Sequence, residues 1–252
     1  MLKTLHSAVY AVILCFGAIT ASAQVNLTAH TTGVGTAVHT TITALGEIAA
    51  DRGIANIQIK DGQTGTKYNM AVAEGKVDIG TLPFVLPFVL SKAAGPYSKL
   101  DKAKGKELAS NMRLLYPYTL SIFTLYAYDA KGIDGFSGLK GLKVLNGPPR
   151  GTAAMNSRQL VQLFSGLKAD TDYESVTVSW NQMPQAIIEG SVDAVLVPAM
   201  FPGPRVTRAS SAGSMTMWSM PKEIFESDKA KKFLNKPGSS PYVVPLSDMK
   251  AA

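Results

Sequence analysis

Cysteine and histidine are almost absent from this sequence. Its 252 residues include one cysteine, Cys15, and three histidines, His6, His30 and His39. Cys15 and His6 lie in an N-terminal segment that we expect to be removed on export, so the mature chain has no thiol for a disulfide, a nucleophile or a metal ligand. With two histidines left, a histidine-based metal site or catalytic triad is not expected, and we expect no cofactor.

Long hydrophobic runs are missing beyond the N-terminus. The apolar stretch 81–90 is too short to span a bilayer and contains two prolines. At the N-terminus, Lys3 precedes an apolar core at 8–19 and small residues at 21–23, which is the order found in secretory signal peptides. We therefore interpret 1–23 as a signal peptide that directs export, with a membrane anchor as the alternative.

A dense stripe of one charge is also missing. Lys and Arg number 25 and Asp and Glu 18, a formal net charge of +7 that falls to +6 when Lys3 is removed. The basic residues are scattered singly, apart from a loose cluster at 99–106. Surfaces that bind nucleic acid usually show a denser basic stripe, so we expect no nucleic-acid partner.

What the sequence does contain is an alternation of strand-length apolar runs and helical patterns. This alternation is typical of an α/β fold with largely parallel sheets. The expected strands cover 26–31, 54–60, 77–82, 144–146, 175–179, 194–197 and 214–218. The expected helices cover 36–51, a short segment ending near Gly75, 152–165, 183–190 and 222–234. The stretch 114–128 is long enough for two strands or for a crossover.

The second half of the chain repeats the pattern of the first. The segment AVAEGKVD at 71–78 recurs as AIIEGSVD at 186–193, an offset of 115 residues. Upstream, GTA at 35–37 recurs at 151–153, an offset of 116. Two matched blocks at nearly the same spacing predict two similar α/β lobes.

The repeat divides the chain into expected domains. Lobe 1 would cover 24–120 and lobe 2 would cover 121–235, with a tail or crossover segment at 236–252. In open α/β sheets, ligands bind beyond the carboxyl ends of the strands. Two such lobes facing each other would form a cleft that closes on a small molecule by a hinge motion.

The candidate ligand-binding residues lie in loops that follow the expected strands. Glycines there let the backbone approach a ligand, hydroxyls and amides donate hydrogen bonds, and the N–H groups of a following helix favour negative charge. In lobe 1 the candidates are Thr32, Gly33, Gly35, Thr36, Thr64, Thr66, Asn69 and Tyr116. In lobe 2 they are Arg150, Gly151, Thr152, Trp180 and Asn181.

Arg150 is the candidate with the most specific chemistry. It would stand before the helix that Thr152 is placed to cap, where its planar guanidinium could grip a carboxylate with two hydrogen bonds. Each candidate has a structural alternative: Arg150 could pair with a surface acid, Thr66 could cap a helix, and Tyr116 could lie in the core. The spacing offers no obvious catalytic carboxylate, so we expect no catalytic residue and no enzyme.

The order and spacing of these motifs resemble the TAXI group of receptors of tripartite ATP-independent periplasmic (TRAP) transporters. The similarity covers about 27–220 and is carried by 31–39, 65–69, 74–80, 115–117, 132–133, 139–144 and 147–152. The resemblance implies a periplasmic-binding-protein-like (type II) fold, a small organic anion as ligand, and delivery to TRAP permease subunits in the membrane. Receptors of ABC or tripartite tricarboxylate transporters, and a periplasmic dehydratase-like enzyme, are the alternatives.

The sequence departs from that family in three places. Tyr118 stands where the family usually has Glu, and Arg150 stands where it has small residues, so the usual glutamate-like ligand does not carry over. The chain stops near Ser247, about where the family crosses back to complete the first lobe. We therefore expect a C-terminally truncated fold whose first lobe exposes apolar residues. The candidates are Phe84, Val85, Phe88 and Val89.

Overall fold

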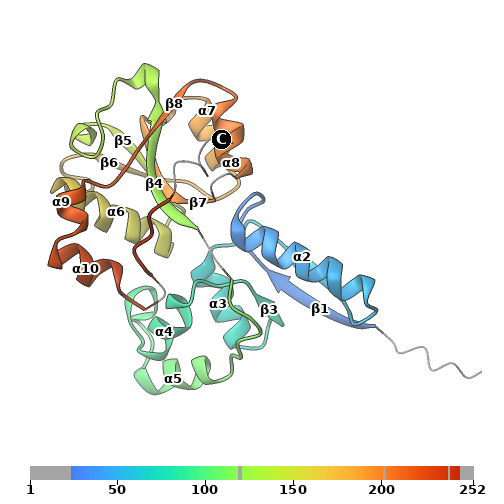
Figure 1. Cartoon of the computed structure of the whole chain (residues 1–252). Helices are drawn as coiled ribbons and strands as arrows, with labels where there is room; N and C mark the ends of the chain where they lie inside the picture. The colour runs from blue at the N-terminus through green and yellow to red at the C-terminus, as the bar shows by residue number, and fades with distance from the viewer. Residues whose placement is uncertain (1–23, 119–120, 201–202, 238, 245–252) are drawn as a thin grey trace, which may run out of the picture.

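The chain forms two β-sheets, each with its own helices, and these make two lobes (Figure 1). The computed structural model describes residues 24–118, 121–200, 203–237 and 239–244. The predicted signal peptide and most of the predicted tail lie outside the described residues. Within them, no helix is long and apolar enough to cross a membrane. The predicted two-lobe α/β fold is confirmed.

Lobe 1 is built on a three-stranded sheet with the order β2-β1-β3, in which all strands are parallel. Its elements are β1 (Val25–His30), α2 (Ala37–Asp51), β2 (Ala55–Lys60), α3 (Gly65–Ala73), β3 (Ile79–Gly80), α4 (Val85–Ser91), η1 (Gly95–Tyr97) and α5 (Lys102–Ser110). Thr36 caps α2, because its side chain accepts a hydrogen bond from the backbone N–H of His39. Helices α3, α4 and α5 enclose a small core around Leu86, Leu90 and Leu108.

Lobe 2 is built on a five-stranded sheet with the order β6-β5-β7-β4-β8. Its strands are β4 (Ile122–Tyr128), β5 (Lys143–Gly147), β6 (Glu174–Thr177), β7 (Ala194–Ala199) and β8 (Met215–Trp218). Its helices are η2 (Asp129–Lys131), η3 (Ser137–Leu139), α6 (Thr152–Ser165), α7 (Met183–Ile188), α8 (Pro204–Ser210), α9 (Lys222–Phe225) and α10 (Asp228–Leu234).

Helices cover both faces of the lobe 2 sheet (Figure 1). Side chains alternate between the two faces of a strand, and β7 places apolar residues on both. Ala194 and Leu196 join the core shared with α6 and α10, whereas Val195 and Val197 join the core shared with α7 and α8. This two-sided burial explains why β7 reads as a continuous apolar run in the sequence.

The expectation of largely parallel sheets is wrong for β4. This strand is antiparallel to both β7 and β8, and its first residue, Ile122, pairs with Ala199 at the end of β7. The chain enters lobe 2 from lobe 1, at the end of the sheet where β5 and β7 finish. Because β4 starts at that end, it runs in the opposite direction to β5 and β7. Of the two possibilities for 114–128, the crossover followed by one strand is the one found.

Neither α5 nor α8 was predicted. Asp101 caps α5 by accepting hydrogen bonds from the backbone N–H groups of Ala103 and Lys104, and α8 begins at Pro204. The helix expected at 222–234 is divided into α9 and α10, because Ser227 adopts an extended conformation and caps the second helix.

The apolar residues expected on the surface of lobe 1 divide into two pairs. Phe84 and Phe88 are exposed, by 63% and 39%. Val85 and Val89 are half-buried against the core of α3, α4 and α5. The expected exposed face is thus formed by the phenylalanines, and the expectation is wrong for the valines because they turn toward Leu86 and Leu90.

The internal repeat of the sequence corresponds to a repeat in the structure. The order β2-β1-β3 in lobe 1 matches β6-β5-β7 in lobe 2, and the pairs are parallel in both. The register also matches: Ala29 pairs with Ile79, and Val144 pairs with Ala194, so partners lie 50 residues apart in each lobe. Both sheets lie within the predicted lobe ranges, whose exact boundaries stay a prediction.

The aspartate of each VD sequence has the same role in both lobes. Asp78 Oδ2 accepts hydrogen bonds from the backbone N–H and hydroxyl of Thr28, both 2.8 Å long. Asp193 accepts from the backbone N–H of Lys143 at 2.9 Å and from Lys131 Nζ at 2.8 Å. The bonds from Thr28 lower the pKa of Asp78. Burial alone would raise the pKa of Asp193, but the bonds from Lys131 and Lys143 outweigh it and lower that pKa.

Replacing Asp193 by alanine should lower the free energy of unfolding by about 1–2 kcal/mol at neutral pH, because two hydrogen bonds to a half-buried carboxylate are lost. The folded-state pKa is lowered, so this stabilisation is complete above the unfolded-state pKa and disappears as the pH falls through the folded-state value. Urea unfolding of wild type and Asp193→Ala at neutral pH and at about pH 2 measures the difference.

Asp134→Ala is the matched control, because Asp134 is exposed and its side chain makes no hydrogen bond within the described residues. It should change the unfolding free energy by less than about 0.5 kcal/mol. An Asp193→Ala effect that is equally large in acid would contradict the assigned role of the carboxylate.

Candidate functional site

The loops that follow the parallel strands of both lobes meet between the lobes. In lobe 1, the loop 31–36 follows β1 and the loop 61–64 follows β2. Two backbone hydrogen bonds join these loops, from Gly62 to Thr32 (3.2 Å) and from Gln63 to Thr31 (2.9 Å). In lobe 2, the turn at 178–182 follows β6, and α8 follows β7 (Figure 1).

Asn181 reaches from lobe 2 to the backbone of both lobe 1 loops. A Cβ atom on Gly33 would lie 2.5 Å from Asn181 Oδ1 and 2.9 Å from Trp180 Cβ. A Cβ atom on Gly62, whose φ is +70°, would lie 2.7 Å from Asn181 Nδ2. A side chain at either position would therefore require Asn181 to move, and at Gly33 it would also meet Trp180 Cβ and the Trp180 backbone.

The same loop of lobe 1 also faces α8. Gly35 has a φ of +78°, and a Cβ atom there would lie 3.6 Å from Pro204 Cβ and 4.0 Å from the backbone nitrogen of Arg205. The structure thus brings together four of the predicted site residues from both lobes. These are Gly33, Gly35, Trp180 and Asn181.

The two threonines of the first loop, Thr32 and Thr36, are used mainly to hold that loop. Their hydroxyl oxygens are 2.6 Å apart, and Thr36 Oγ1 also donates to the carbonyl oxygen of Gly33 at 2.8 Å. Thr32 is buried and Thr36 is half-buried. These hydroxyls fix the backbone of the loop that touches lobe 2.

The candidates on α3 lie within lobe 1. Asn69 is fully buried, and its Nδ2 donates to the hydroxyl of Tyr97 at 2.9 Å. That hydroxyl donates in turn to the carbonyl oxygen of Thr66 at 3.0 Å. Thr64, and not Thr66, is the N-cap of α3, although its side chain makes no capping bond. Tyr116 is 38% exposed on the crossover segment and does not lie in the core.

Arg150 lies at an exposed turn before α6. It has a φ of +59°, an unusual conformation for a residue other than glycine, and its side chain makes no hydrogen bond or ion pair within the described residues. The expected cap by Thr152 is wrong. The chain turns one residue earlier, where Gly151 is extended and occupies the N-cap position, and Thr152 is the first residue of the helix. The ligand roles of Arg150, Gly151 and Thr152 stay predictions.

Arg205 is the residue that the sequence analysis missed. It is 6% exposed, and its guanidinium carbon lies 5.0 Å from the centre of the Trp180 ring. Burial lowers the pKa of the guanidinium, and the nearby Tyr126 opposes that shift. The available signal was an arginine directly after a Gly-Pro pair that follows a fully apolar strand, in the segment 203–205.

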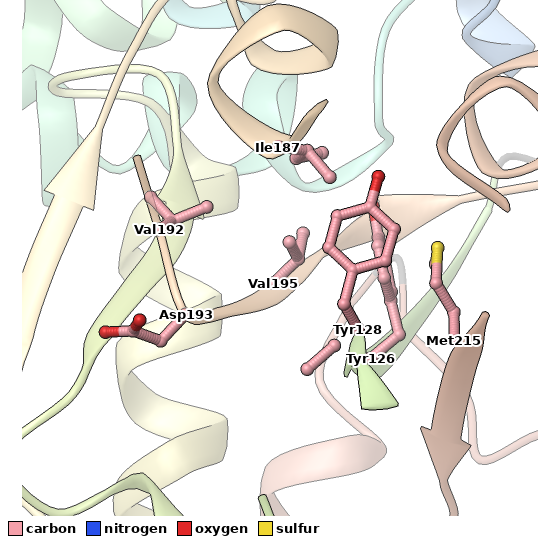
Figure 2. A pocket seen from close by; sticks show the side chains of 8 residues that line it. Tyr126, Tyr128, Ile187, Val192, Asp193, Val195 and Met215 are labelled. Atoms are coloured by element: carbon pink, nitrogen blue, oxygen red, sulfur yellow. The ribbon is translucent and has the colours of Figure 1, made fainter. Parts of the chain in front are cut away.

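A small hollow lies within lobe 2, and Tyr126 forms part of its wall (Figure 2). Its walls include Tyr128, Ile187, Val195 and Met215, and its volume is about 10 Å³. That volume holds about one water molecule, so the hollow is too small for a ligand. Within the described residues, no cluster of three or more histidine, cysteine, aspartate or glutamate side chains could hold a metal ion.

A model of the NMT1-like family matches residues 26–246 of the chain. No curated protein sequence matches it. Several solved structures are similar to it in fold.

The aliphatic sulphonate binding protein SsuA from Escherichia coli is 19% identical, with a TM-score of 0.46, over 76% of this chain and 59% of that protein. The alkanesulfonate-binding protein SsuA from Xanthomonas axonopodis pv. citri, bound to MOPS, is 17% identical, with a TM-score of 0.49. The match covers 79% of this chain and 61% of that protein. The nitrate-binding protein NrtA from Synechocystis PCC 6803 is 14% identical, with a TM-score of 0.42. The match covers 69% of this chain and 47% of that protein.

All three are described as periplasmic or ligand-binding proteins, and none as an enzyme. The chain spans about three fifths of the length of the two SsuA proteins and about half the length of NrtA.

Gly33→Ala should push the lobes apart, because the added methyl group would meet Trp180 Cβ, which is fixed by its own backbone. Such overpacking costs about 1–3 kcal/mol. Since the φ of Gly33 is not in the left-handed region, the effect isolates the contact between the lobes from backbone strain. Small-angle scattering should show a larger radius of gyration for the variant.

Gly46→Ala is the control, because a methyl group there would lie 3.6 Å from its nearest neighbour, an ordinary contact within lobe 1. It should leave the radius of gyration unchanged. Equal radii for Gly33→Ala and wild type would show that the lobes do not approach at this glycine in solution.

Proposed function

The chain belongs to the NMT1-like family, and on that premise we propose that it is a periplasmic solute-binding protein that takes up one small organic anion between its two lobes. The observation that carries this proposal is the approach of Gly33 to Trp180 and Asn181, in the loop where Gly35 faces Pro204. These residues lie in loops at the carboxyl ends of parallel strands, where open α/β sheets bind ligands.

Binding between the lobes follows from the repeated architecture. Each lobe offers the end of a parallel sheet, and a molecule held between two such ends is removed from water when the lobes close. A ligand that contacts both lobes favours the closed arrangement by its difference in affinity for the closed and open states. The glycines of lobe 1 leave backbone N–H and C=O groups accessible to such a ligand.

We further propose that the protein delivers its ligand to the membrane subunits of a TRAP transporter. The support for this step is the order and spacing of the TAXI-like motifs between residues 27 and 220. An ABC or tripartite tricarboxylate transporter is the alternative recipient. Uptake by right-side-out membrane vesicles of the producing cells distinguishes them, because a TRAP transporter requires an imposed ion gradient and no ATP.

Ligand binding should close the lobes and stabilise the protein. Native mass spectrometry of protein purified from the periplasm should detect one bound small anion per chain. Refilling the emptied protein with that anion should reduce the radius of gyration in small-angle scattering. At a ligand concentration of 100 times the dissociation constant, the unfolding free energy should rise by about 2.7 kcal/mol.

Two controls accompany this experiment. The Gly33→Ala variant should bind the anion more weakly, and Gly46→Ala should bind it like wild type. A purified protein that carries no small molecule and whose scattering profile does not respond to any carboxylate, sulfonate or nitrate probe would contradict the proposed function. Turnover of a bound acid would instead indicate an enzyme.

A further inference from the structure

Three donor groups of lobe 2 are buried in the same part of its core, and none of them has an acceptor among the described residues. They are the guanidinium of Arg205 through Nε and Nη2, the indole N–H of Trp180 and the hydroxyl of Tyr126. Arg205 lies over the Trp180 ring, and Tyr126 is close enough to influence its pKa. Nearly all buried polar groups in folded proteins have a partner, so three unpaired donors in one place require an explanation.

The cation has no counter-ion within the described residues. No carboxylate there forms an ion pair with Arg205, and Tyr126 is neutral because burial raises the pKa of its hydroxyl. The Trp180 ring offers a cation–π contact, which compensates only part of the loss of hydration. A buried charge without a partner is strongly unfavourable, and an anion is the partner that would correct it.

The donors lie directly behind the contact between the lobes. Trp180 lies next to the loop of lobe 1 at Gly33, and the start of α8 at Pro204 and Arg205 faces Gly35. A molecule that enters between the lobes when they open would therefore lie next to the turn of Trp180 and the start of α8, which carry these donors. Nothing comparable holds for Arg150, which is exposed at a turn.

We propose that Arg205, with the indole N–H of Trp180 and the hydroxyl of Tyr126, forms the subsite that binds the carboxylate group of the ligand. The proposal rests on the proposed function and names its ligand class. Nε and Nη2 form one edge of the planar guanidinium, and this edge matches the two oxygens of a carboxylate. All three groups donate when Tyr126 directs its proton to the ligand, so a deprotonated acid fits and an amide or amine does not.

The test compares Arg205→Met with wild type in two measurements. In calorimetric titrations with acetate, pyruvate, succinate and glutamate, the probe that binds wild type most tightly should bind Arg205→Met at least about tenfold more weakly. Without any added anion, Arg205→Met should melt at a higher temperature than wild type, because an unpaired buried charge has been replaced by an apolar side chain.

Matched variants separate the subsite from a general effect of charge. Arg208→Met removes an exposed arginine from the same helix and should change neither measurement. Arg205→Lys keeps the charge without the two-pronged edge, and its affinity should lie between those of wild type and Arg205→Met. Arg150→Ala tests the alternative arginine.

The outcomes distinguish this subsite from the proposed function. The subsite is overturned if a carboxylate binds wild type and Arg205→Met with equal affinity. It is also overturned if Arg150→Ala, and not Arg205→Met, loses that binding. In both cases the proposed receptor function stands. Detection of an uncharged ligand by native mass spectrometry would also overturn the subsite and leave the receptor function standing. A lower melting temperature or failure to fold of anion-free Arg205→Met also overturns it, because Arg205 would then stabilise the fold. If no small molecule binds wild type, both proposals fail.

Discussion

The arrangement of the two lobes depends on how closely Asn181 approaches the backbones of Gly33 and Gly62. A methyl group at either glycine would come within 2.7 Å of the Asn181 side chain, which is closer than real contacts allow. The contact is small. At Gly33 it includes Trp180 Cβ and the Trp180 backbone, so it limits how closely the ends of the two sheets can approach. The proposed site rests on this approach, because Trp180 precedes Asn181 in the same turn and Arg205 lies over the Trp180 ring.

Much of the fold could be predicted because the information is local. Helix α6 is found at the predicted residues, and strands β2 and β8 differ from prediction by one residue. These elements are marked by apolar periodicity and by glycine or threonine at their ends. The repeat was visible because the aspartate of each VD sequence has the same structural role. Asp78 and Asp193 each accept a hydrogen bond from a backbone N–H 50 residues earlier in the chain.

The parts that could not be predicted depend on contacts between distant segments. The direction of β4 follows from the side at which the chain enters lobe 2, and no local pattern encodes that side. Gly33 and Asn181, which were predicted from their loop chemistry, lie close together between the lobes, whereas Asn69 was expected at the ligand and is buried beside Tyr97. Arg205 was missed because its burial results from the packing of α8 against Trp180, 25 residues earlier in the chain.

Arg205 also bears on what happens when no ligand is bound. Water is the partner of a guanidinium that lacks an anion, and water reaches this one more readily once the lobes separate. If Arg205 forms the proposed subsite, its hydration would favour the open arrangement of the empty receptor, and a bound anion would remove that advantage. The two forms would present different shapes to a membrane partner, so the same buried cation that recognises the cargo would also report whether cargo is present.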